Sequence, residues 1–137
     1  MPTNNLIQKL RMKNNEGIRF AYDEEGDTLE IFFGENEPAT GVEITDDILL
    51  RLNKAAGRAI SLTIHHFSIL AEQTEYGPRS FALENIDTLP DELREIVLRV
   101  ITTPPTNQFL KISYFQDSPT KCVPLTYIET SCFAAAA

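Results

Sequence analysis

Apolar and polar side chains alternate with a period of two through the first half of the chain. Of all features of the sequence, this pattern most restricts the folds that the chain can adopt. It is typical of strands with one buried face. Turn-forming stretches at residues 23–27, 34–41 and 53–57 interrupt it. The alternating apolar residues are Ile18, Phe20, Tyr22, Leu29, Ile31, Phe33, Ile48, Leu50, Leu52, Ile60, Leu62 and Ile64. With Val42 to Ile44 as a short strand, the pattern predicts an antiparallel β-meander of about five strands over residues 17–70.

A helix is predicted over about residues 90–102. Thr88 is the expected N-cap, Pro90 suits the first turn, and Pro104-Pro105 should end the helix. Its apolar stripe consists of Leu89, Leu93, Ile96, Val97, Val100 and Ile101. A sheet with one apolar face needs a cover, so we expect this helix to pack on the sheet.

Two further strands are expected near Gln108 to Phe115 and Lys121 to Ile128. Pro124 removes a hydrogen-bond donor, so the last strand should be an edge or contain a bulge. A chain of 137 residues suits one core. We therefore predict a single α+β domain, 1–137, made of a basic N-terminal segment (1–16), the meander (17–70), the helix (88–103) and a C-terminal strand pair (107–128).

The chain is acidic, with 12 Lys+Arg against 20 Asp+Glu and a formal net charge of -8. Residues 16–47 hold eleven acids against Arg19, which gives -10. Such a field repels nucleic-acid phosphates and favours a basic partner or simply solubility. Gly26 is expected to supply positive φ in the acidic turn. The predicted interaction surface consists of Asp23, Glu24, Glu25, Asp27 and Glu30.

Nothing in the chain resembles a membrane span or a secretory signal, so we expect a cytoplasmic protein. Cys122 and Cys132 lack a C-x-x-C spacing, which predicts free thiols rather than a disulfide or zinc site. We give the tail Ala134 to Ala137 no weight in the fold. No nucleotide-binding, nucleophile-elbow or full calcium-loop motif is present, so we expect neither a cofactor nor a metal.

His65-His66 is the only histidine pair and the weak candidate for acid/base chemistry. Adjacent strand residues point to opposite faces, which argues against both rings binding one ion. In register with Leu62 and Ile64, His66 should lie on the core side and His65 should face out. A structural role is favoured, and metal binding or catalysis is the alternative.

Residues Phe20 through Phe67 resemble the family catalogued as domain of unknown function 2283. The residues that carry the resemblance are Tyr22-Asp23, Asp27-Thr28-Leu29-Glu30-Ile31, Ile48-Leu49-Leu50 and Gly57-Arg58-Ala59-Ile60 with Leu62 and Ile64. The resemblance implies a small β-rich fold without any assigned activity, and some members are thought to sit beside small toxin-like proteins. Arg51, Asn53 and His65-His66 depart from the family pattern, and the first two disfavour a carboxylate metal site there.

Several apolar residues exceed what one helix can cover. Leu49 and Phe32 should point to the back face of the sheet, and the other surplus residues are Leu98, Phe109, Phe115, Leu110, Ile112 and Tyr114. C-terminal strands or a second copy of the chain could bury them, and we expect a homodimer. The functional hypothesis is a non-enzymatic interaction protein that binds a basic partner, conceivably a small toxin-like or nucleic-acid-handling protein. The alternative is a small-molecule-binding or hydrolytic pocket at His65 or His66.

Overall fold

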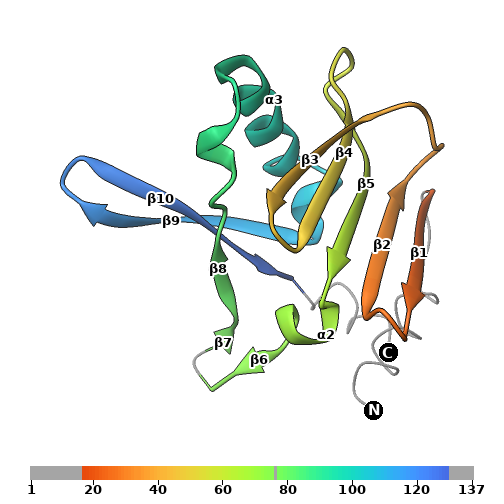
Figure 1. The fold of residues 1–137 in the computed structure, drawn as a ribbon, viewed down its shortest axis with the longest axis horizontal. Coiled ribbons are helices and arrows are strands. Elements are labelled where there is room, and N and C mark those ends of the chain that lie inside the picture. Colours follow the sequence, from red (N-terminus) through yellow and green to blue (C-terminus); the bar gives the residue numbers. More distant parts are fainter. Residues whose placement is uncertain (1–16, 76, 130–137) are drawn as a thin grey trace.

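The computed structural model describes residues 17–75 and 77–129 (Figure 1). The predicted basic segment 1–16, Cys132 and the Ala134–Ala137 tail lie outside these residues. The described chain is mostly β, with a five-stranded antiparallel sheet, a three-stranded sheet and few helices.

All five predicted strands of the first sheet form, but their order differs from a meander. The strands are β1 (Ile18–Asp23), β2 (Thr28–Phe33), β3 (Thr40–Thr45), β4 (Ile48–Asn53) and β5 (Arg58–His65). They lie in the order β1-β2-β5-β4-β3, so β5 pairs with β2 and β3 becomes an edge. The sequential order is therefore wrong. The reason is burial: β5 is the most continuously buried strand and suits the centre, whereas exposed Gly41 and Glu43 suit an edge.

A bulge in β5 changes which of its residues face the core. Leu52 pairs with Ala59 and Arg51 pairs with Ser61, which leaves Ile60 as the extra residue. Ala59, Leu62 and Ile64 belong to the core cluster, while Ile60 is buried outside it. The predicted stripe of Ile60, Leu62 and Ile64 is thus wrong at its first position, because strict alternation cannot anticipate an inserted residue.

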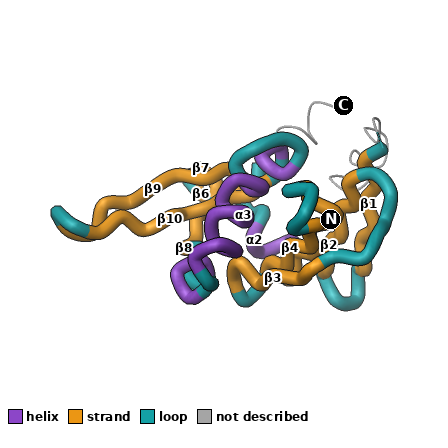
Figure 2. The backbone as a smooth tube through the Cα atoms, turned by 90° about the horizontal axis from the view of Figure 1, so that it is seen from above, coloured by secondary structure: helices purple, strands orange, loops and turns teal. Residues whose placement is uncertain are grey.

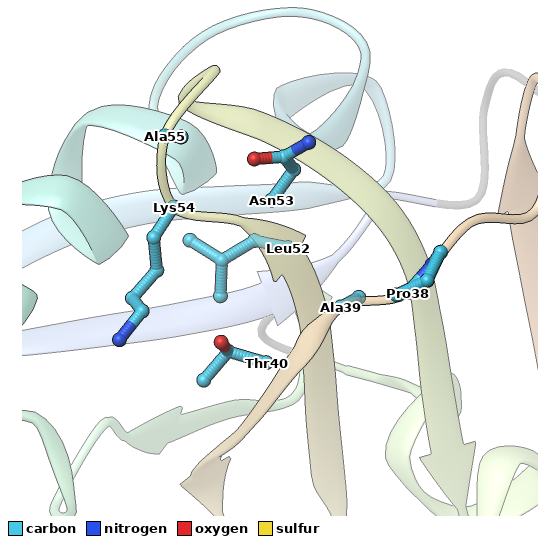
Figure 3. A pocket seen from close by; sticks show the side chains of 7 residues that line it. All are labelled: Pro38, Ala39, Thr40, Leu52, Asn53, Lys54 and Ala55. Atoms are coloured by element: carbon cyan, nitrogen blue, oxygen red, sulfur yellow. The ribbon is translucent and has the colours of Figure 1, made fainter.

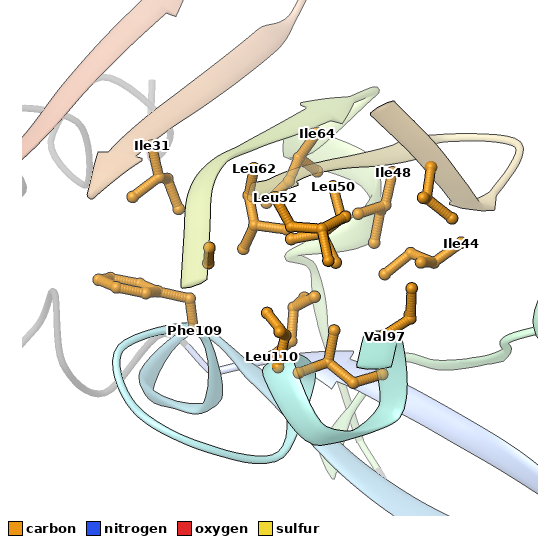
Figure 4. Packing of buried hydrophobic residues seen from close by; sticks show 14 of the residues in the cluster. Ile31, Ile44, Ile48, Leu50, Leu52, Leu62, Ile64, Val97, Phe109 and Leu110 are labelled. Carbon is orange, nitrogen blue, oxygen red and sulfur yellow. The ribbon is translucent and has the colours of Figure 1, made fainter. Parts of the chain in front are cut away.

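The predicted helix forms as α3 (Asp91–Ile101). Val97, Val100 and Ile101 are buried in the core cluster, and Val97 lies beside Ile44 in Figure 4. Thr88 is not the N-cap: it ends the 3₁₀ turn η1 (Ile86–Thr88), where its hydroxyl donates to the Asn85 carbonyl at 2.7 Å. Pro90 takes the N-cap position instead. Another helix, α2 (Phe67–Leu70), is a single turn that follows β5 directly.

A second sheet has the strand order β8-β10-β9. Its strands are β8 (Ser80–Ala82), β9 (Leu110–Ser118) and β10 (Lys121–Ile128), and a small pair, β6 (Gln73–Thr74) with β7 (Gly77–Pro78), precedes it. The prediction that the last strand is an edge or contains a bulge is wrong, since the extra residue at the β9–β10 register shift is residue 117 of β9. β10 is central rather than an edge. Pro124 fits because its carbonyl accepts from the Leu83 N–H at 3.0 Å, just past the end of β8.

Phe109 joins the two sheets. It ends the 3₁₀ turn η2 (Thr106–Gln108) immediately before β9, and its ring lies 5.9 Å from that of Phe20 and 6.0 Å from that of Phe33. Figure 4 shows Phe109 and Leu110 facing the buried face of the first sheet. Part of the apolar surplus is therefore buried within the chain. The homodimer stays a prediction.

The far end of the β9–β10 hairpin projects away from the body of the protein (Figure 2). Ile69, at 49% exposure, and Tyr114, at 62%, are large apolar residues that are left exposed. Phe32 and Leu49 lie half-buried on the back face of the first sheet, opposite Ser61 and Thr63, as the alternation predicts.

We predict that Phe109→Ala lowers the free energy of unfolding by about 3–5 kcal/mol, because it leaves a cavity between the sheets. Ile69→Ala, at an exposed site, should change it by no more than about 0.5 kcal/mol. Urea denaturation followed by circular dichroism measures both. Equal effects of the two substitutions would show that Phe109 does not join the sheets.

Candidate functional site

Three connections converge at one end of the five-stranded sheet. They are the β1–β2 turn, the β3–β4 turn and the β5–α2 junction, because Thr28 pairs with His65 and Ile48 pairs with Ile64. The His65 N–H donates to the Asp47 carbonyl at 2.8 Å, and the Phe67 N–H donates to the Asp27 carbonyl at 3.0 Å. Figure 1 shows α2 beneath β5 at this end. We call this region the acidic end; its carboxylates are Asp23, Glu24, Glu25, Asp27, Asp46 and Asp47.

Asp27 holds the acidic end together. Its carboxylate accepts hydrogen bonds from the Tyr22 hydroxyl at 2.6 Å and from the Ser68 hydroxyl at 2.6 Å. The Ser68 N–H also lies 3.1 and 3.2 Å from the two carboxylate oxygens. Asp27 thus satisfies an N–H of the first turn of α2, as a local cap would, from 41 positions away in sequence.

The turn that presents Asp27 differs from the predicted one. Asp27 itself has φ 49°, whereas Gly26 does not have positive φ. Aspartate is one of the few non-glycine residues that tolerate this conformation. A Cβ at Gly26 would lie 2.9 Å from a carboxylate oxygen of Asp23, an exposed side chain that can move aside.

The hydrogen bonds to Asp27 change two pKa values. Burial acts to raise the pKa of Asp27, but hydrogen bonds from Ser68 and Tyr22 outweigh it and lower the pKa below its usual 3.8. Burial, together with the adjacent Asp27 carboxylate, raises the pKa of Tyr22 to about 12. Both shifts favour an ionised aspartate beside a neutral phenol.

The two histidines take different positions from one another. His65 is exposed as predicted, and its Nδ1 lies 3.1 Å from the Thr28 hydroxyl. The prediction that His66 lies on the core side is wrong, because the strand ends at His65 and His66 adopts φ 56°. Phe67 takes the buried position instead, and the His66 ring is exposed with its Nδ1 2.9 Å from Asp47 Oδ1.

This arrangement offers binding groups rather than an activated nucleophile. The Ser68 hydroxyl donates to Asp27, so its proton is directed at a carboxylate and not at a histidine base. Within residues 17–75 and 77–129, no three His, Cys, Asp or Glu side chains form a group that could hold a metal ion. In the same part of the chain, no helix has the length and apolar character to cross a membrane.

The opposite end of the sheet is built around paired arginines. Arg58 lies 3.0 Å from Glu37, and the Asn53 amide donates to Glu37 at 2.9 Å, contacts that lower the pKa of Glu37. Arg51 reaches the Asn36 side chain at 3.2 Å. Arg51 and Asn53, which depart from the family pattern, thus hold the β2–β3 loop. Beside them lies an open pocket of about 390 Å³ (Figure 3), lined by Pro38, Ala39, Thr40, Leu52, Asn53, Lys54 and Ala55.

Comparison with known proteins bears on the segment that contains both ends. Residues 19–68 match the model of the family described as protein of unknown function (DUF2283). The predicted resemblance is thereby confirmed. The DUF2283 match covers the five-stranded sheet except its first residue, Ile18, and reaches into α2, so it includes Asp27 and Ser68. The helix α3 and the second sheet lie beyond it. No curated protein and no solved structure matches the chain.

The sequence signalled only some of the residues at this site. It singled out Asp23, Glu24, Glu25 and Asp27 by composition, and His65-His66 by type. It gave no local signal for the contact of Asp27 with Ser68, because that contact depends on β2 pairing with β5.

Asp27→Asn should lower the free energy of unfolding at pH 7 by about 1–2 kcal/mol, because it removes the charge that caps α2 while keeping a side chain that tolerates positive φ. Folding lowers the pKa of Asp27, so its contribution is present above the unfolded pKa and is lost as the pH falls through the folded value. The difference between variant and wild type should therefore shrink in acid. Denaturant titrations of variant and wild type at pH 7 and in acid test this. Glu25→Gln, at an exposed site in the same turn, is the control.

Tyr22 should make the fold sensitive to alkali. Its folded pKa of about 12 lies above its usual 10.0, so its contribution is complete below pH 10 and is lost as the pH rises towards 12. Tyr22→Phe should lose less stability than wild type between about pH 10 and about pH 12. Denaturation across this range provides the measurement, and an unchanged alkaline loss in the variant contradicts the assignment.

Proposed function

We propose that the protein is a non-enzymatic interaction module of the cytoplasm that binds a basic protein partner through its acidic end. One observation carries the proposal: turns 23–27 and 46–47, separate in sequence, meet at the same end of the sheet. Six carboxylates therefore contribute to one field there. A field of one sign attracts a partner of the opposite sign and speeds the encounter.

Positive charge in the same unit is segregated from the acidic end. The Lys and Arg residues of 17–75 are Arg19, Arg51, Lys54 and Arg58. All four lie towards the other end, near the start of β1, the second half of β4 and the β4–β5 turn. Just beyond α2, Arg79 lies 3.7 Å from Glu72, so that arginine is paired. The acidic end therefore keeps most of its negative charge.

The carboxylates at the acidic end divide into two groups. Asp23, Glu24, Glu25 and Asp46 are exposed and are the groups we assign to the partner. Asp27 and Asp47 are half-buried, and their side chains contact Ser68 and His66 respectively. Asp27 thus supports the surface by fixing the turn. Glu30 lies half-buried in β2, opposite Thr63 on the back face, and we assign it a place at the margin of the surface.

The contacts of Asp27 matter for binding because they order the turn before a partner arrives. A preorganised loop loses less conformational entropy on association than a free one. A lysine- and arginine-rich face, such as that of a small toxin-like protein, is the complementary partner. Solubility alone would need no such ordering of the turn.

The experiment compares two double charge reversals that alter the net charge equally. Glu24→Lys/Glu25→Lys should weaken binding of a lysine-rich peptide by about tenfold or more at low salt, whereas Glu84→Lys/Glu95→Lys, at exposed sites outside the acidic end, should change it little. Calorimetric titration measures both. A pull-down from cell extract with the same variants then tests the natural partner, and binding that ignores salt and both reversals defeats the proposal.

A histidine-based ligand site is the second candidate function. The 2.9 Å contact between His66 and Asp47 favours it, because a carboxylate can orient an imidazole for acid/base work. His66→Gln would then abolish binding of the small-molecule ligand and leave binding of a lysine-rich peptide intact. If His66→Gln instead weakens binding of the lysine-rich peptide and leaves binding of the small molecule intact, His66 belongs to the acidic end alone.

A further inference from the structure

The outer edge of β9 stands out among the sheet edges of the molecule. β9 is a nine-residue strand with β10 on one side and no described strand on the other. The hairpin that carries it extends away from α3 and from the first sheet (Figure 2). An unpaired edge presents N–H and C=O groups that can pair with another strand.

Two hydrogen bonds show which β9 residues point their backbone N–H and C=O groups away from β10. The Pro124 carbonyl points at Leu83, away from β9, so Tyr114, which lies opposite Pro124, does not bond β10 through its backbone. The Glu129 N–H donates to the Phe109 carbonyl at 2.9 Å, which places residues 109, 111, 113 and 115 in the β10 ladder. The backbone groups of Leu110, Ile112, Tyr114 and Gln116 therefore point outward.

The other edges carry features that discourage pairing. β1 and β3 have six residues each; β1 carries Arg19 and Asp23, and the β3–β4 register shifts between Glu43 and Thr45. β8 has only three residues. In contrast, residues 110–116 form a regular run with one charge, Lys111, and no proline. The bulge near the hairpin tip ends this run, because the pairing skips residue 117.

We propose that the β9 edges of two copies of the chain pair antiparallel about a two-fold axis at Ser113, which forms a homodimer with a continuous six-stranded sheet. This register keeps all pairing within residues 110–116. It sets Ile112 opposite Tyr114 of the second copy, twice, and an aromatic beside a β-branched residue is a favourable cross-strand pair. It also explains why Tyr114, in the middle of the edge, is 62% exposed.

A second copy fits this edge better than an unrelated strand does. Pairing about Ser113 repeats every contact by symmetry, and the exposed Tyr114 of each copy covers the half-buried Ile112 of the other. The two Lys111 side chains stay about 13 Å apart along the strands, so they do not repel strongly. The acidic end belongs to the five-stranded sheet and not to the sheet that contains β9. Two short edges bury less area than a standard interface, so we expect a dissociation constant in the micromolar range.

Sedimentation equilibrium of wild type and Tyr114→Pro tests the dimer. Proline at 114 removes an outward N–H but no bond to β10, so the fold should be kept while the dissociation constant rises about tenfold or more. Circular dichroism and the thermal midpoint check the fold, and Tyr114→Lys is the alternative variant if proline unfolds the chain. A monomer up to roughly 1 mM, or a dimer unaffected by both variants, overturns the proposal.

Disulfide trapping tests the register. In a Cys122→Ser/Cys132→Ser background, Ser113→Cys should cross-link two copies on oxidation, since facing residues of a non-hydrogen-bonded pair lie about 4.5 Å apart at Cα. Lys111→Cys is the matched control and should not, because its copies are out of disulfide reach. Cross-linking at 111 in preference to 113 overturns the register and with it the proposed axis.

Discussion

The pairing of β2 with β5 is the constraint on which the rest of the structure depends. Thr28 lies opposite His65, and this register brings the β1–β2 turn to the β5–α2 junction. It also makes β5 the central strand, which in turn places β4 and then β3 on its other side. A one-residue slip would move every side chain of β2 to the opposite face, and Leu29, Ile31 and Phe33 would leave the core.

Much of the fold could be predicted from the sequence because it depends on local patterns. Alternating apolar residues locate all five strands of the first sheet, and the apolar stripe with its flanking prolines locates α3. The strand order could not be predicted, since hairpin patterns say nothing about which hairpins pair. The prediction that His66 faces the core was wrong for a related reason. His66 adopts a left-handed conformation that ends the alternation, and nothing in the composition marks that position.

The candidate site shows the same division. The composition of the sequence locates the acidic turn, but it does not distinguish one carboxylate of the turn from another. The structure separates Asp27, whose oxygens are bound within the chain, from Glu24 and Glu25, which are exposed. Likewise, a linear count of -10 over residues 16–47 hides the difference between the two ends of the sheet. Glu37 faces Arg58 at one end, whereas the arginines of residues 17–75, Arg19, Arg51 and Arg58, all lie away from the other end.

The placement of the β2–β3 loop has a consequence for how the chain can vary. Residues 34–39 connect β2 to β3 at the end of the sheet remote from Asp27. Lengthening such a loop raises the entropic cost of closing it only slowly, by about 0.6 kcal/mol for each doubling of the loop length. Insertions there should enlarge the wall of the pocket beside Pro38 and Lys54 without disturbing the acidic turn. The two ends of the sheet can therefore change in size independently.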